Sequence, residues 1–180
     1  DPAIDGKALP GVAMKWTPNK EFTEWTFDLN PEAKWSDGED VTAHDFVFSY
    51  KRMLSPDPNW PAQYSEMLYF LKNAQEYNKG KITDFAQVGA KAVDKHTLLL
   101  TLRGPIPYLP ELTKHYTWYP VPEHIVLKHG KINTAFSSQW TRPGNLVSNG
   151  PFQLKTWTTN HKIEVERNPH YWDAETVSLN

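Results

Sequence analysis

Seven histidines are the side chains of this sequence best suited to ligate a metal or to act as a base. The sequence contains no H-E-x-x-H motif, and His124 and His129 are five positions apart, a spacing that places them on different faces of a helix. Cysteine is absent and no G-x-S-x-G segment occurs, so no nucleophile is recognisable. We therefore predict no metal site and no cofactor.

Paired carboxylates, of the kind that glycosidases use, do not stand out either. Glu24 and Asp28 fit the solvent face of a strand, Asp37 fits a turn, and Asp45 fits the start of a helix. Since ordinary structural positions account for these four acids, we predict that the protein is not an enzyme.

Aromatic side chains are better candidates for a binding function. The sequence has eight tryptophans and eight tyrosines, which combine rigid apolar surface with a polar tip. Trp25 and Trp35 fall in a strand and beside a turn, where a core position is expected. Four others lie in or beside predicted loops and are candidates for a ligand cleft, with a core position as the alternative: Trp60, Tyr64, Trp118 and Tyr119.

The elements that must position these side chains begin with a strand at 25–29, where apolar and polar residues alternate. A turn follows at 36–38, because Ser and Asp can bond their own backbone and Gly tolerates a positive φ. Thr42 is the expected N-cap of a helix, and Asp45 stands at the position of a capping-box partner. Apolar residues of 46–54 then recur at helical spacing.

Later segments are predicted from the same periodicities. Asp94 and Lys95 form the turn of a hairpin whose second strand alternates until Gly104 and Pro105. A change of composition at 142–145 marks a linker. The other predicted elements are helices at 62–73, 84–88, 107–114 and 122–128, and strands at 152–158 and 162–167.

Composition is that of a globular protein. With 39% hydrophobic residues, 22% charged residues and a formal net charge of -2, the 180-residue chain is neither disordered nor suited to a nucleic acid. No apolar run approaches the ~20 residues that cross a bilayer, and the first residues do not resemble a signal peptide.

The segment 33–50 resembles a signature of the extracellular solute-binding proteins of the oligopeptide and dipeptide class, the receptors of peptide-importing ABC transporters. The similarity rests on Lys34-Trp35-Ser36-Asp37-Gly38, Val41-Thr42-Ala43 and Asp45-Phe46-Val47. Further motifs similar to those of the family lie at 93–98, 120–122, 149–152 and 169–172. Together they cover nearly the whole chain.

The resemblance implies an α+β (mixed α/β) fold. Residues 1–143 are expected to form the extra N-terminal α+β domain of a class II periplasmic-binding-protein-like fold, and 144–180 an incomplete segment of its sheet lobe. We therefore expect an N-terminal fragment of a longer protein, in which the strands at 152–167 lack most of their neighbours.

The implied function is capture of a peptide, or a related small solute, between two lobes for delivery to the ABC permease subunits in the membrane, with no covalent step. The implied location is periplasmic or extracellular, with a membrane anchor before this segment as one form. A free-standing carbohydrate-binding or interaction module rich in aromatics is the alternative.

The resemblance also indicates site residues. His115 lies just before Pro120-Val121-Pro122, where the family has a residue near the ligand pocket; a buried histidine bonded to backbone is the alternative. The family's aromatic contact falls on Trp60 or Tyr64. Groups that fix peptide termini belong to segments outside this chain, so we expect residues 1–180 by themselves to bind peptide weakly or not at all.

Overall fold

The computed structural model describes residues 7–57, 62–133 and 139–179. These residues form two compact units, each made of more than one stretch of chain. Unit 1 comprises residues 1–30 and 42–120, and unit 2 comprises 31–41 and 121–180. A domain boundary near residue 143 in the natural protein stays a prediction. Helices and sheets occur together, which confirms the mixed α+β fold class.

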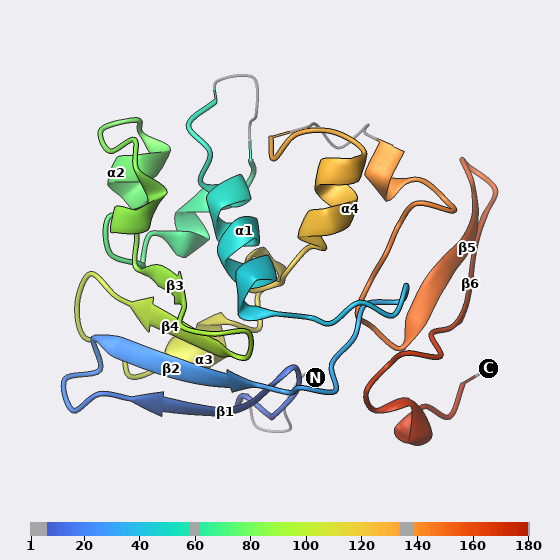
Figure 1. Ribbon diagram of the computed structural model, residues 1–180, viewed down its shortest axis with the longest axis horizontal. Helices are drawn as coiled ribbons and strands as arrows, with labels where there is room; N and C mark the ends of the chain where they lie inside the picture. The colour runs from blue at the N-terminus through green and yellow to red at the C-terminus, as the bar shows by residue number, and fades with distance from the viewer. Residues whose placement is uncertain (1–6, 58–61, 134–138, 180) are drawn as a thin grey trace. The chain divides into compact units, whose positions relative to one another are not determined.

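Unit 1 is built on a four-stranded antiparallel sheet in the order β1-β2-β4-β3 (Figure 1). The strands are β1 (Ala13–Pro18), β2 (Glu24–Leu29), β3 (Ala90–Ala92) and β4 (Thr97–Thr101). Its helical elements are α1 (Ala43–Met53), η2 (Ser65–Leu68), α2 (Ala74–Asn78), η3 (Phe85–Gln87), α3 (Leu109–Leu112) and η4 (Tyr116–Trp118).

Strand β2 confirms the predicted alternation. Trp25, Phe27 and Leu29 are buried in the core of the unit, whereas Glu24 and Asp28 are exposed. Removing three large apolar side chains from water on one face fixes the register against β4, because a slip of one residue would turn all three outward.

Helix α1 begins at the predicted capping box. Thr42 Oγ1 accepts a hydrogen bond from Asp45 N at 3.4 Å, and Asp45 Oδ2 accepts one from Thr42 N at 2.8 Å. Tyr50 and Leu54 are then buried in the core. Burial raises the pKa of the Tyr50 hydroxyl, which donates to the carbonyl of Trp118 at 3.2 Å.

The prediction of a helix at 62–73 is wrong. Only the single turn η2 forms there, and both Tyr64 and Asn73 have left-handed backbones with φ of 65° and 59°. Leu71 forms an isolated bridge with Leu102, so the chain lies against the end of β4. Leu68 and Leu71 are buried as their spacing indicated, but sheet contacts prevailed over helix formation.

The hairpin β3–β4 and the helical turns near 85, 109 and 123 form where predicted, most of them shorter. In the hairpin turn, Asp94 Oδ1 accepts from His96 N at 2.8 Å. This backbone hydrogen bond lowers the pKa of Asp94 below its usual value.

Unit 2 contains the predicted turn at Ser36–Gly38, with Gly38 at φ +93°. Its elements are α4 (Glu123–Lys128), η5 (Gln139–Thr141), β5 (Phe152–Thr158), β6 (Lys162–Arg167) and η6 (Ala174–Thr176). Trp35 is buried, as predicted, at 1% exposure, close to the turn that the signature motif forms.

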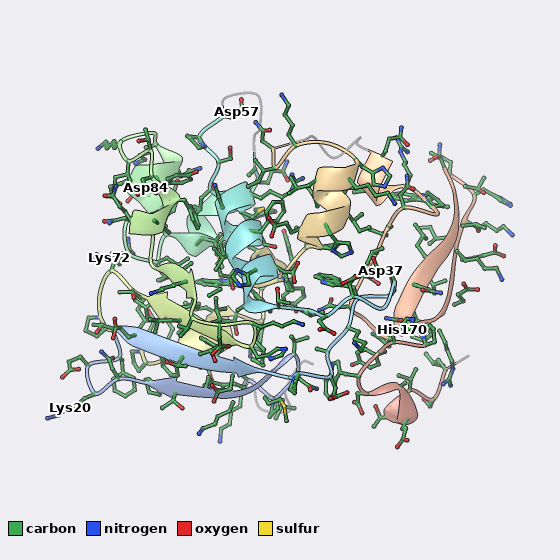
Figure 2. The ribbon with its side chains drawn as sticks, viewed as in Figure 1. Lys20, Asp37, Asp57, Lys72, Asp84 and His170 are labelled. Carbon is green, nitrogen blue, oxygen red and sulfur yellow. The ribbon has the colours of Figure 1, made fainter. Side chains whose placement is uncertain are left out.

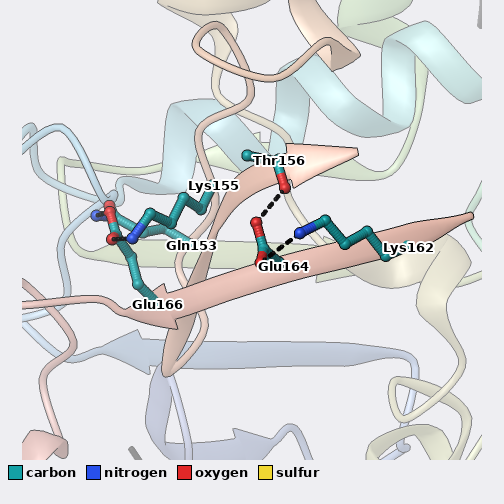
Figure 3. Close-up of polar contacts among 6 residues, drawn as sticks. All are labelled: Gln153, Lys155, Thr156, Lys162, Glu164 and Glu166. Carbon is teal, nitrogen blue, oxygen red and sulfur yellow. Dashed lines mark hydrogen bonds and ion pairs between the residues drawn. The ribbon is translucent and has the colours of Figure 1, made fainter. Parts of the chain in front are cut away.

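Strands β5 and β6 have the predicted bounds and pair only with each other among the described residues. One face is polar (Figure 3): Glu164 accepts from Thr156 Oγ1 at 2.7 Å and from Lys162 Nζ at 2.9 Å. These bonds lower the pKa of Glu164. Trp157 and Ile163, which are cross-strand partners, are exposed.

Candidate ligand-binding site

The candidate site is built around the segment that joins α3 to η4 in unit 1. His115 N donates to Leu112 O at 3.1 Å, and His115 is the N-cap of η4. Its Nδ1 accepts from Thr117 N at 3.3 Å. In the neutral ring the proton must therefore be on Nε2, which makes Nε2 a donor for a ligand carbonyl.

Three rings gather at this segment. The His115 ring stacks on Tyr116 at 4.2 Å between centroids and meets the ring of Tyr64 edge-on at 5.8 Å. Tyr64 and Tyr116 are also edge-on, at 5.8 Å. His115 is half-buried, whereas the tyrosines are 47% and 59% exposed. The cluster therefore presents apolar ring surface and hydroxyls to solvent.

The structure thus brings together His115 and Tyr64, which are two of the five predicted site residues. They lie 51 positions apart in the sequence. Tyr116 joins them without having been predicted, because one tyrosine in a tyrosine-rich segment carries no distinguishing sequence signal. Desolvation and the neighbouring Tyr64 hydroxyl raise the pKa of Tyr116.

The other predicted residues lie differently. Tyr119 is 54% exposed and its hydroxyl donates to Lys114 O at 3.0 Å. Trp118 is only 1% exposed, and its ring packs edge-on against Tyr50 with 5.6 Å between the ring centroids. It therefore occupies a core position, which was the alternative to a cleft position. Trp60 lies outside the described residues.

Trp118 still has a polar atom of interest. Among the described residues, its indole Nε1 and the neighbouring Thr117 Oγ1 are buried without a hydrogen-bond partner. Unpaired buried donors are uncommon in folded proteins, and these two belong to the second and third residues after His115.

No described group of three or more His, Asp or Glu side chains is arranged to hold a metal ion. His124, one of the two histidines weighed as ligands, instead pairs through Nε2 with Asp37 Oδ2 at 2.7 Å. Within the described ranges, no helix combines the length and apolar character required to cross a membrane.

Comparisons of the sequence and of the fold with known proteins agree on one class of protein. The family model "Bacterial extracellular solute-binding proteins, family 5 Middle" matches residues 7–180. The periplasmic oligopeptide-binding protein OppA of Salmonella typhimurium is 44% identical over 177 residues, and the periplasmic murein peptide-binding protein MppA of Escherichia coli is 41% identical over 173. These alignments cover 97% and 96% of this chain.

Listeria monocytogenes OppA bound to peptide has a similar structure, with a TM-score of 0.85 and 36% identity over 97% of this chain and 33% of that one. The fold and the matched residues place the chain in the class of the extracellular solute-binding proteins. The chain belongs to family 5 of the bacterial extracellular solute-binding proteins. It spans about 31% of the length of the Salmonella relative and 30% of that of MppA.

Proposed function

We propose that this chain is part of the substrate-binding receptor of an ABC importer, which captures peptides between two lobes and delivers them to permease subunits in the membrane. The 44% identity to an oligopeptide-binding protein across 97% of the chain carries this proposal. Its location is then periplasmic or extracellular, and its action is binding without catalysis.

The cluster His115, Tyr64 and Tyr116 is the proposed contact surface for peptide, and the exposed Tyr119, four residues after His115, is proposed as a further contact. The His115 Nε2–H donates to a peptide carbonyl, while the exposed rings cover apolar parts of peptide side chains. Trp118 supports the site from the core, where its ring packs on Tyr50. Trp60 remains a proposed contact.

A free-standing carbohydrate-binding module had only aromatic richness in its favour. The relatives reported above are named for oligopeptides and murein peptides, which supports the receptor instead.

The test is calorimetric titration of the natural, full-length protein with di-, tri- and oligopeptides, with sugars and nickel alongside. We expect tight binding of a peptide class, and we expect His115→Ala to weaken it about tenfold, the effect of losing ~1.4 kcal/mol. Tyr108→Ala is the matched control, because Tyr108 is 52% exposed and its side chain makes no cap bond. Sugar binding without peptide binding would reject the proposal.

A further inference from the structure

Two anchored residues of unit 2 flank Asn149. On one side, Ser148 O accepts from Ser36 N at 2.8 Å, and Ser148 N donates to Ser36 Oγ at 3.2 Å. On the other side, Gly150 O accepts from Asn168 Nδ2 at 2.9 Å. The connection through Asn149 therefore joins the signature turn to the residue that follows β6.

Asn149 itself has no such anchor. Its side chain is half-buried and makes no hydrogen bond with the residues that the structure describes. The backbone N–H of Gly150 likewise has no acceptor among the described residues. Asn149-Gly150 is also the single Asn-Gly pair of the sequence. Because glycine has no Cβ to hinder the approach, its nitrogen can reach the side-chain carbon of the asparagine before it.

A comparable pair in the same unit, Asp37-Gly38, is held in place. Gly38 N donates to Trp35 O at 2.9 Å, and Asp37 Oδ2 pairs with His124 Nε2 at 2.7 Å. The ring of His170 lies beside Gly38, and Figure 2 shows Asp37 and His170 close together. An aspartate can cyclise as an asparagine does, but here its carboxylate and the attacking nitrogen are both bonded already. The two pairs therefore differ in how free their reacting atoms are.

We propose that Asn149 is a site of spontaneous deamidation in the folded protein. The Gly150 nitrogen attacks Asn149 Cγ and gives up its proton, the Cγ–Nδ2 bond breaks, and ammonia leaves with that proton. The product is a cyclic imide, a succinimide. Water then opens the ring, adding its hydroxyl to a carbonyl carbon while the nitrogen regains a proton. Attack at Cγ gives aspartate, and attack at the main-chain carbonyl gives isoaspartate.

Both products change this part of unit 2. Each adds one negative charge, and isoaspartate also lengthens the main chain between Ser148 and Gly150 by one methylene group. The bonds from Ser148 to Ser36 and from Gly150 to Asn168 are set by the shorter connection, so the longer one strains their geometry. Unit 2 therefore loses stability as isoaspartate accumulates.

Peptide mapping of the full-length protein by mass spectrometry tests the proposal. The folded protein, and the same protein unfolded in guanidinium chloride, are incubated at mildly alkaline pH, and the exchange of NH2 for OH is followed at each asparagine. Dividing the folded rate by the unfolded rate removes the intrinsic effect of the next residue.

The internal comparison is Asn145, whose side chain donates to Gln139 O at 2.9 Å. The nitrogen that would attack it, Leu146 N, is also bonded, to Arg142 O at 2.9 Å. We expect folding to slow the reaction of Asn149 less than about tenfold, and that of Asn145 at least about tenfold more than that. Equal protection of the two asparagines would overturn the proposal.

Variants separate the chemical step from its effect on stability. Gly150→Ala should slow deamidation about tenfold, because a Cβ hinders the attacking nitrogen. No atom lies within 4 Å of that Cβ position and φ is not left-handed there, so the fold accommodates it. Gly104→Ala, which is equally unhindered, is the control and should leave the rate unchanged. Unchanged deamidation in Gly150→Ala would overturn the proposed reaction.

Asn149→Asp supplies the new charge without the longer main chain. Its melting temperature should therefore lie above that of protein enriched in isoaspartate at this position. Equal melting temperatures would overturn the role of the lengthened backbone. None of these measurements uses a ligand, so the result is independent of the proposed peptide binding.

Discussion

At Thr42 one side chain decides where α1 begins. Its hydroxyl accepts from Asp45 N, and the Asp45 carboxylate accepts from both Thr42 N and Thr42 Oγ1. Two N–H groups that the helix leaves without partners are satisfied in this way. Both the turn at Gly38 and this helix start fall within the segment 33–50, since α1 begins at Ala43.

Thr42→Ala should lower the free energy of unfolding by about 1 kcal/mol, because the cap is lost. Thr42→Ser retains the hydroxyl and should restore most of the loss. Urea unfolding followed by circular dichroism measures both. An alanine variant as stable as the natural chain would show that Asp45 is sufficient to start the helix.

Gly38→Val should cost more, about 1–2 kcal/mol, because a β-branched residue is strained at φ +93°. An added Cβ itself meets no clash, since its nearest atom is His170 Cε1 at 3.5 Å. Gly104→Val is the control: no atom lies within 4 Å of its Cβ position and its φ is not left-handed. Equal melting temperatures of the two variants would contradict a backbone origin of the cost.

Among the elements, strand β4 holds unit 1 together. It pairs with β2 on one side and β3 on the other, and Leu98 and Leu100 are buried in the core. Leu99 faces the opposite side of the sheet and is half-buried. The two faces of this strand therefore contribute unequally to stability.

Leu100→Ala should destabilise unit 1 by about 2–5 kcal/mol, since it leaves a cavity next to residues that are close-packed. Leu99→Ala should cost clearly less. Thermal unfolding of the two variants, monitored by tryptophan fluorescence, compares them. A larger loss for Leu99 would mean that the core lies on the other face of the sheet.

Sequence periodicity predicted helices and strands well where residues close in the sequence supply the backbone hydrogen bonds. Strands β5 and β6 have their predicted bounds because they pair with each other across a short connection. The helix at 62–73 failed because Leu71 pairs with Leu102, a contact that no local pattern contains. The same distinction holds for the candidate site. The order of the family motifs predicted His115 as a site residue. The contact of Tyr64 with Tyr116 and the burial of Trp118 depend on tertiary packing, which the sequence pattern does not contain.

For the whole molecule, the central question is how much of the binding energy these 180 residues supply. The chain spans 31% of the Salmonella relative, and the proposed contacts here are one donor nitrogen and exposed rings. Neither the His115 donor nor the exposed rings supply an opposite charge to bind the charged amino or carboxyl end of a peptide. In the proposed two-lobed receptor, ligand contacts from one side alone stay open to water, so each contributes less to affinity than it would in a closed site.

We therefore expect residues 1–180 to bind peptides at least about a hundredfold more weakly than the full-length protein, a difference of ~2.8 kcal/mol. Thermal shift and calorimetry with one peptide series, run on both forms, make the comparison. His115→Ala in the full-length protein is the internal control, because its effect shows that contacts from this chain take part. Micromolar or tighter binding by the 180-residue chain would show instead that it holds a complete site, and the aromatic cluster of unit 1 would then be the first place to locate it.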